Sequence, residues 1–151
     1  MCENNSKSFG FHLMSYRVSP SAKSPALFHR GHHVLVDASG AGQGKYCMAA
    51  VVVFDGVVQT MQSKPCLAGS SVLAERECIE WAFEQWPQAT VWNDCIPAIE
   101  AVLLEQPALT GALFWPTPRM RKPFHDLAHL LSVKARGLVN AKTWDEIPAS
   151  V

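Results

Sequence analysis

The apolar residues in the first half of the chain gather in three short runs that are typical of β-strands. Residues 32–38, 46–54 and 57–62 are rich in valine and other aliphatic side chains. The Asp-Gly pair between the second and third runs is a strong signal for a two-residue hairpin. We therefore predict three antiparallel strands in a meander, with a glycine-rich turn at 40–44 between the first two. A dinucleotide-binding role of that turn is disfavoured, because no helix follows it.

The second half of the chain changes to helical spacing. Residues 71–86 place apolar side chains along one helical stripe, and a proline ends the pattern. Two more helices, at 97–105 and 124–136, and two strands, at 89–93 and 109–115, complete the order of elements. Because a strand that follows a helical crossover can lie parallel to an earlier strand, the fourth strand can neighbour the first.

These elements divide the chain into three parts: an irregular N-terminal arm at 1–30, one domain at 31–137 and a C-terminal tail without clear pattern at 138–151. The arm is rich in Ser, Asn and Pro, and its bases outnumber its acids. It could therefore contact a polyanion, although a solvated tail is the favoured interpretation.

Composition agrees with one domain, since 48% of the 151 residues are hydrophobic and can fill a core. The 13 Lys and Arg balance the 13 Asp and Glu, which argues against a generally cationic protein but not against local patches. Acids predominate in residues 73–106 and bases in 115–151. The acidic middle and the basic end are distinct regions.

The five cysteines are odd in number and none forms a CxxC pair, so neither a disulfide framework nor a zinc site is indicated. We expect a reduced, intracellular setting, which we place in the cytoplasm. The chain shows no signal-peptide pattern, and no apolar run approaches the roughly 18 residues that span a bilayer. A soluble protein without membrane contact is expected; its oligomeric state stays open, with a monomer favoured.

Four acidic residues stand at special places in the predicted elements. They are Asp37 at the end of an apolar strand run, Glu75 on the apolar stripe of the first helix, Asp94 directly after the fourth strand, and Asp126 in the first turn of the last helix. A carboxylate that loses its hydration needs a partner, a proton or a metal cation. Four converging carboxylates would repel one another unless divalent cations held them, and oxygen-only ligation suits Mg²⁺ or Mn²⁺. Two such ions about 4 Å apart activate a water and steady the leaving oxygen in phosphodiester cleavage.

Each of these acids also has a purely structural interpretation. Asp94 could cap the helix that follows it, and Asp126 could complement a helix dipole. Asp37 could pair with a buried base, and Glu75 could be a frayed first-turn acid. All four structural explanations must hold together for the site to be absent.

The sequence resembles the ribonuclease H family in four short motifs that come in the same order on the same elements. They are Asp-Ala-Ser at 37–39, the helical stretch AERECIEWAF at 74–83, Asn-Asp-Cys at 93–95 and Asp-Leu-Ala at 126–128. The resemblance covers about residues 34–136. It implies an α/β fold with a five-stranded mixed sheet, three antiparallel strands and then two parallel crossover strands, flanked by helices.

The resemblance also implies an activity: metal-dependent hydrolysis of the RNA strand in an RNA/DNA hybrid. Carried over by position, the ligands of two Mg²⁺ or Mn²⁺ ions are Asp37, Glu75, Asp94 and Asp126, with Glu75 also placed to influence the attacking water. The turn residues that match hybrid contacts are Ser39, Gly40, Ser70 and Ser71. Such polar loops can contact the wide, shallow minor groove of an A-like duplex.

This sequence departs from the family in the loop after the fifth strand, where members commonly carry a mobile histidine. The loop has Arg119, Arg121 and Lys122 instead. We assign Arg119 a phosphate or leaving-group role and the other two substrate binding, with His125 as an alternative to the missing histidine. The connection at 105–109 is too short for the basic protrusion of some members, so affinity that depends on the basic loop should fall with salt.

Two competing functions remain open. A DNA nuclease or strand transferase of the resolvase or integrase type resembles this chain in using carboxylates on the same scaffold, although the Ala-Glu motif of the first helix favours ribonuclease H. A non-catalytic, nucleic-acid-binding module of the same fold would be favoured by the loss of one carboxylate, and all four are present. A DEDD-type exonuclease is disfavoured, because Ala38 and Ser39 follow Asp37 where that class has Asp-x-Glu.

Overall fold

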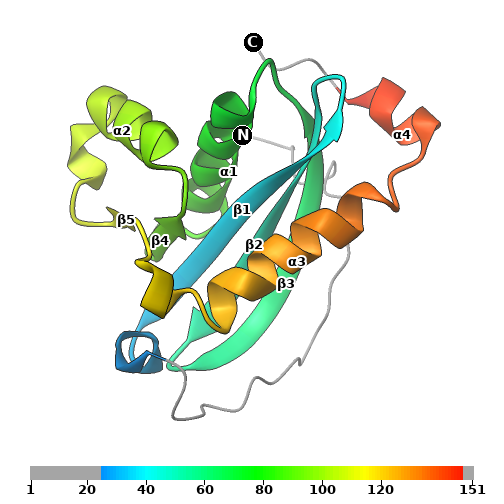
Figure 1. Cartoon of the computed structure of the whole chain (residues 1–151). Coiled ribbons are helices and arrows are strands. Elements are labelled where there is room, and N and C mark those ends of the chain that lie inside the picture. The colour runs from blue at the N-terminus through cyan, green and yellow to red at the C-terminus, as the bar shows by residue number, and fades with distance from the viewer. Residues whose placement is uncertain (1–24, 148–151) are drawn as a thin grey trace.

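The computed structural model describes residues 25–147, which form a five-stranded mixed sheet with helices on both faces (Figure 1). The strands are β1 (His32–Gly42), β2 (Lys45–Phe54), β3 (Val57–Leu67), β4 (Thr90–Asn93) and β5 (Leu113–Phe114). They lie in the order β3-β2-β1-β4-β5, with β1, β2 and β3 antiparallel and with β4 parallel to both β1 and β5. The predicted α/β architecture is confirmed.

The α-helices are α1 (Ser71–Gln85), α2 (Ile96–Glu105), α3 (Phe124–Arg136) and α4 (Ala141–Glu146). Within residues 25–147, three short 3-10 turns accompany them: η2 (Ala26–His29), η3 (Pro107–Leu109) and η4 (Pro118–Met120). Of the helices in the described part of the chain, none is both long and apolar enough to cross a membrane.

Alternate residues of β1 supply two separate apolar cores. Val34 and Val36 pack with α1 and α2 on one face of the sheet, around residues such as Ile79. Leu35 packs on the other face with the apolar side of α3, including Phe124. Because side chains alternate along a strand, Asp37 points to the same face as Leu35, toward α3.

The meander is longer than predicted. β1 continues through the glycines to Gly42, and the turn is made by Gln43 and Gly44, which both have positive φ angles (56° and 74°). β3 continues to Leu67 and includes Pro65. A proline is tolerated there because β3 is an edge strand and needs no hydrogen bond on its outer side. The fifth strand, by contrast, has only two residues.

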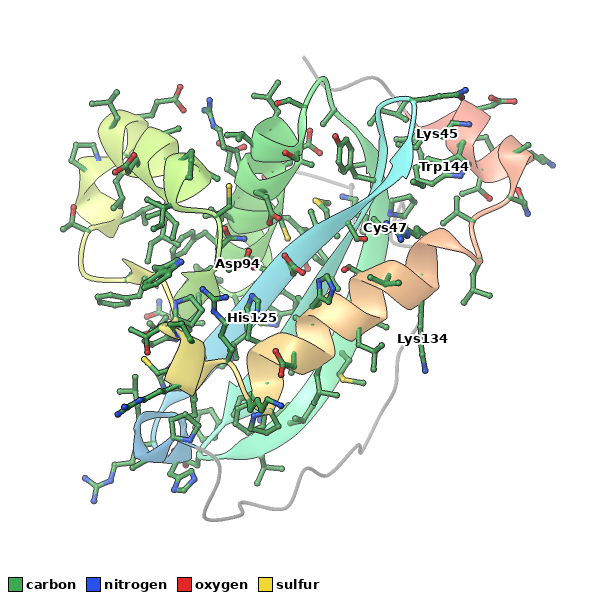
Figure 2. All side chains as sticks on the ribbon, in the orientation of Figure 1. Lys45, Cys47, Asp94, His125, Lys134 and Trp144 are labelled. Carbon is green, nitrogen blue, oxygen red and sulfur yellow. The ribbon has the colours of Figure 1, made fainter. Side chains whose placement is uncertain are left out.

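The segment after α3 is also more ordered than a tail without pattern. Helix α4 is capped by Asn140, whose side chain accepts from the Thr143 amide, and its Trp144 packs on Cys47 and Ala135. Lys45 lies over the indole, with its Nζ 5.8 Å from the ring centroid (Figure 2). This contact attaches α4 to the β1–β2 end of the sheet.

Most of the predicted N-terminal arm, residues 1–24, lies outside the described residues. The part that is described forms η2, and its Phe28 is fully buried. The Phe28 ring makes edge contacts with His33, Trp92 and Phe124. Phe28 therefore belongs to the core beneath α3, whereas Ala26, Leu27 and Arg30 are exposed.

Candidate metal centre

Asp37, within β1, and Asp94, directly after β4, occupy corresponding positions on two neighbouring parallel strands. The β1–β4 register ends at the pair Val36 and Asn93, and the two aspartates follow directly. Open sheets with parallel crossovers bind ligands at this edge, beyond the carboxyl ends of their strands. Asp37 is buried, whereas the Asp94 side chain is 30% exposed. Burial, followed by repulsion from Asp94, raises the pKa of Asp37.

Glu75 reaches the two aspartates from α1. It is buried on the inner face of the helix, where the helical spacing had placed it. Its Oε1 accepts a hydrogen bond of 2.8 Å from Asn93 Nδ2, which also donates to the Val36 carbonyl. Burial and then the charge of Asp37 raise the pKa of Glu75 to about 9. An acid held in this way keeps its proton at neutral pH unless a cation is close.

Helix α3 presents two histidines, and not Asp126, to the carboxylates. His129 Nδ1 lies 2.7 Å from Asp37 Oδ2, and His125 Nε2 lies 3.6 Å from Asp94 Oδ2. His125 and His129 are four residues apart and therefore share one face of the helix, whereas position 126 is turned about 100° from position 125. Asp126, which the sequence placed among the ligands, is exposed, and among the described residues the group of ligand atoms that lie within 4.8 Å of one another does not include it.

The ligand atoms of Asp37, Asp94 and His125 all lie within 4.8 Å of one another. Figure 2 shows Asp94 and His125 on the same side of the sheet, from the segment after β4 and from the start of α3. His125 is buried, and in the described part of the chain neither of its ring nitrogens has a hydrogen-bond partner. Two carboxylates and an unpartnered imidazole at this distance suit a divalent cation, which would neutralise the acids and accept the nitrogen lone pair.

The basic loop lies next to this cluster through Trp115, whose Nε1 donates to the Asp94 carbonyl. The Arg121 guanidinium stacks on the Trp115 ring at 5.3 Å and donates to the Pro116 carbonyl. Arg119 and Lys122 are exposed. The loop thus offers two exposed cationic side chains and one that packs against an aromatic ring.

The four turn residues expected at a substrate surface fall in two places. Ser39 and Gly40 lie toward the far end of β1, where Arg136 of α3 donates to the Ser39 hydroxyl (2.7 Å) and to the Gly40 carbonyl. Ser70 caps α1, since its hydroxyl accepts from the Leu73 amide. Ser71 begins that helix and is exposed.

No family model and no curated protein sequence matches this chain. Among solved structures, it is similar to a chain described as the foamy viral protease-reverse transcriptase in complex with dsDNA. The TM-score is 0.54, and the match covers 73% of this chain and 96% of that one. The fold is ribonuclease H-like. At 13% sequence identity the likeness extends to the fold alone.

Asn93 and His129 were not among the predicted site residues, although both contact a carboxylate. Asn93 stood inside the quoted Asn-Asp-Cys motif, and its position one residue before Asp94 places it on the opposite face of the sheet, toward Glu75. For the histidines the available signal was their spacing. Positions 125 and 129 share a helical face with the buried positions 128 and 132, which the exposed position 126 does not.

Proposed function

We propose that this protein is a divalent-metal-dependent endoribonuclease that hydrolyses the RNA strand of RNA/DNA hybrids. The observation that carries the proposal is the cluster of Asp37, Asp94 and His125, with Glu75 adjoining it, at the ligand-binding edge of a ribonuclease H-like sheet. That the foamy viral neighbour was solved with dsDNA favours a nucleic acid as the substrate class.

Asp37, Glu75 and Asp94 are proposed to hold one pair of Mg²⁺ or Mn²⁺ ions, and the exposed Asp126 is left out of the set. Bound metal supplies Lewis-acid stabilisation of the phosphate and a water of lowered pKa. His129, hydrogen-bonded to Asp37, fixes the direction in which that carboxylate presents its oxygens. Asn93 does the same for Glu75.

The basic loop is proposed to hold the scissile phosphate and its neighbours. Arg119 and Lys122 are exposed and available to phosphate oxygens, and the Arg121–Trp115 stack offers a flat cationic surface beside Asp94. A second proposed contact with the hybrid is formed by Arg136, Ser39 and Gly40, further along β1 and α3. Basic side chains before the start and at the end of α3 would suit a duplex that extends along this helix.

The decisive experiment is cleavage of a hybrid with its RNA strand labelled, in Mg²⁺ and in Mn²⁺, compared with duplex DNA and single-stranded RNA. We expect cleavage of the RNA strand with the DNA strand intact. Asp37→Asn should lower the rate by at least about a hundredfold, because removing a metal ligand costs several kcal/mol of transition-state stabilisation.

Asp126→Asn is the matched control, since it makes the same change on the same side of the sheet at an exposed position. It should retain activity within a few-fold. Equal cutting of duplex DNA would favour the resolvase or integrase type of enzyme. Hybrid binding without any cleavage, in both metals, would favour a non-catalytic nucleic-acid-binding module.

A further inference from the structure

Among the described residues, His125 is a buried polar side chain with two polar atoms that lack a partner. It is 97% buried, as its relative exposure is 3%, and neither ring nitrogen has a hydrogen-bond partner within residues 25–147. An imidazole normally donates from one nitrogen and accepts at the other, so this burial leaves two polar groups unsatisfied. A buried polar group without a partner destabilises the fold, because it has lost its hydration and gained no hydrogen bond in return. A bound partner for the His125 ring nitrogens would therefore stabilise the folded protein.

The surroundings of the ring restrict what that partner is. Nε2 faces Asp94 Oδ2 at 3.6 Å, which is too long for a hydrogen bond, and Asp37 contributes a second carboxylate oxygen within 4.8 Å. A water molecule could satisfy the nitrogen but would leave the charges of two aspartates opposed. A divalent cation among the three atoms satisfies the nitrogen and neutralises both acids.

We propose that His125 is a direct metal ligand, and that it makes this centre bind Mn²⁺, Co²⁺ or Zn²⁺ in preference to Mg²⁺. Mg²⁺ is a hard cation that is held by oxygen and keeps its waters, whereas imidazole nitrogen suits the first-row transition metals and zinc. A set of two carboxylates and one histidine with open positions resembles the three-ligand sets of catalytic transition-metal sites. The oxygen-only ligation expected from the four acids is therefore replaced by mixed nitrogen and oxygen ligation.

The position of the ring on α3 explains how the fold provides this ligand. Phe124 and Ala128, on either side of His125, pack in the core against β1 and β2, so the start of the helix is held against the sheet. His129, one turn later, is 61% exposed and already contacts Asp37. It is thus placed to orient a ligand from outside, while His125 points into the cluster.

The inference deepens the proposed function, because it concerns the same site, but its test needs no substrate. Mg²⁺, Mn²⁺ and Co²⁺ are titrated into chelator-treated full-length protein by calorimetry, and pulsed EPR records the nitrogen couplings of bound Mn²⁺. We expect Mn²⁺ and Co²⁺ to bind at least tenfold more tightly than Mg²⁺, with one directly coordinated ¹⁴N. Equal affinities, or Mn²⁺ without a nitrogen coupling, would overturn the inference.

Variants assign the nitrogen to one histidine. His125→Gln should lose the ¹⁴N coupling and at least tenfold of the Co²⁺ affinity, whereas His129→Gln should keep the coupling. His125→Asp restores an all-oxygen set and should narrow the gap between Mg²⁺ and Mn²⁺. If the His125 variants do not fold, the wild-type EPR spectrum and the His129→Gln spectrum still decide the question. Tight Mn²⁺ binding through nitrogen without hybrid cleavage would contradict the proposed function and leave this inference standing.

Discussion

At the scale of single residues, the site is organised by acids that have lost most of their hydration. Asp37 and Glu75 are both buried, and the pKa of each is raised, first of all by that burial. Asp37 has a side-chain hydrogen bond with His129, and Glu75 accepts one from Asn93. Such acids destabilise the metal-free fold when ionised, which is the usual cost of a site prepared for cations.

Glu75→Gln should change how the stability of the chelator-treated protein depends on pH. Because the pKa of Glu75 is about 9 in the folded protein and near 4.5 when unfolded, the folded state binds the extra proton between these values. The contribution of protonated Glu75 to the free energy of unfolding is complete below pH 4.5 and is lost as the pH rises toward 9. A glutamine keeps the bond from Asn93 without a proton to lose, so at pH 8 the variant should be more stable by a few kcal/mol, at most about 5.

Urea unfolding at pH 5, 6.5 and 8 measures this effect, with Glu84→Gln as the control at an exposed position of the same helix. The control should follow the wild type. Asp37 acts in the same direction and remains in both variants, so a smaller decline with pH is expected in Glu75→Gln, not its disappearance. A wild-type stability that rises from pH 5 to pH 8 would contradict the placement of Glu75.

At the scale of elements, α3 connects the site to both ends of the sheet. Its first turn carries His125, its second His129, and its last residue, Arg136, contacts Ser39 and Gly40 on β1. Beyond it, Trp144 attaches α4 to the β1–β2 end of the sheet (Figure 2). The position of α3 therefore sets both the geometry of the site and the contacts of Arg136 with Ser39 and Gly40.

Trp144→Ala should lower the free energy of unfolding by about 2–4 kcal/mol, because it removes a buried aromatic side chain from its contacts with Cys47 and Ala135. Thermal and urea unfolding measure the loss. Leu138→Ala, at a residue that is 64% exposed in the same segment, is the control and should cost less than about 0.5 kcal/mol. Equal effects of the two changes would mean that α4 does not pack as described.

Arg119→Gln tests the basic loop. Its side chain is exposed, and we expect it to contact a phosphate oxygen of the hybrid. The variant should weaken hybrid binding several-fold and reduce the slope of log affinity against log salt by about 1. Lys142→Gln, an exposed base on α4, is the charge-matched control. An unchanged slope in Arg119→Gln would remove this residue from the interface.

At the scale of the whole molecule, metal binding and folding should be linked. A cation that binds only the folded state stabilises it by RT ln(1 + [L]/Kd), or about 2.7 kcal/mol at a hundred times Kd. Saturating Mn²⁺ should therefore raise the Tm of chelator-treated protein by several degrees. Asp37→Asn should abolish this shift, whereas Asp126→Asn should keep it. A wild-type Tm that Mn²⁺ does not change would contradict a cation site among the described residues.

The order of elements and their types could be predicted from the sequence, because they depend on local patterns. The Asp55-Gly56 hairpin is an example: both residues have the positive φ angles that a tight turn needs, and few other residue pairs adopt them. Helical spacing likewise predicted the buried position of Glu75. Element lengths were less predictable, since the extension of β3 through Pro65 depends on β3 being an edge strand.

The amino-acid sequence by itself determined which side chains can do chemistry and which elements carry them: Asp37 in an apolar strand, Glu75 on an inner helical stripe, Asp94 after a strand. Only the tertiary structure decided which residues of α3 join them. A shift of one residue along a helix turns the side chain by about 100°, and the packing of Phe124 and Ala128 on the sheet sets that rotation. This rotation directs His125 and His129 to the carboxylates and leaves Asp126 exposed. It depends on contacts between residues far apart in the chain, which the local sequence of a helix does not determine.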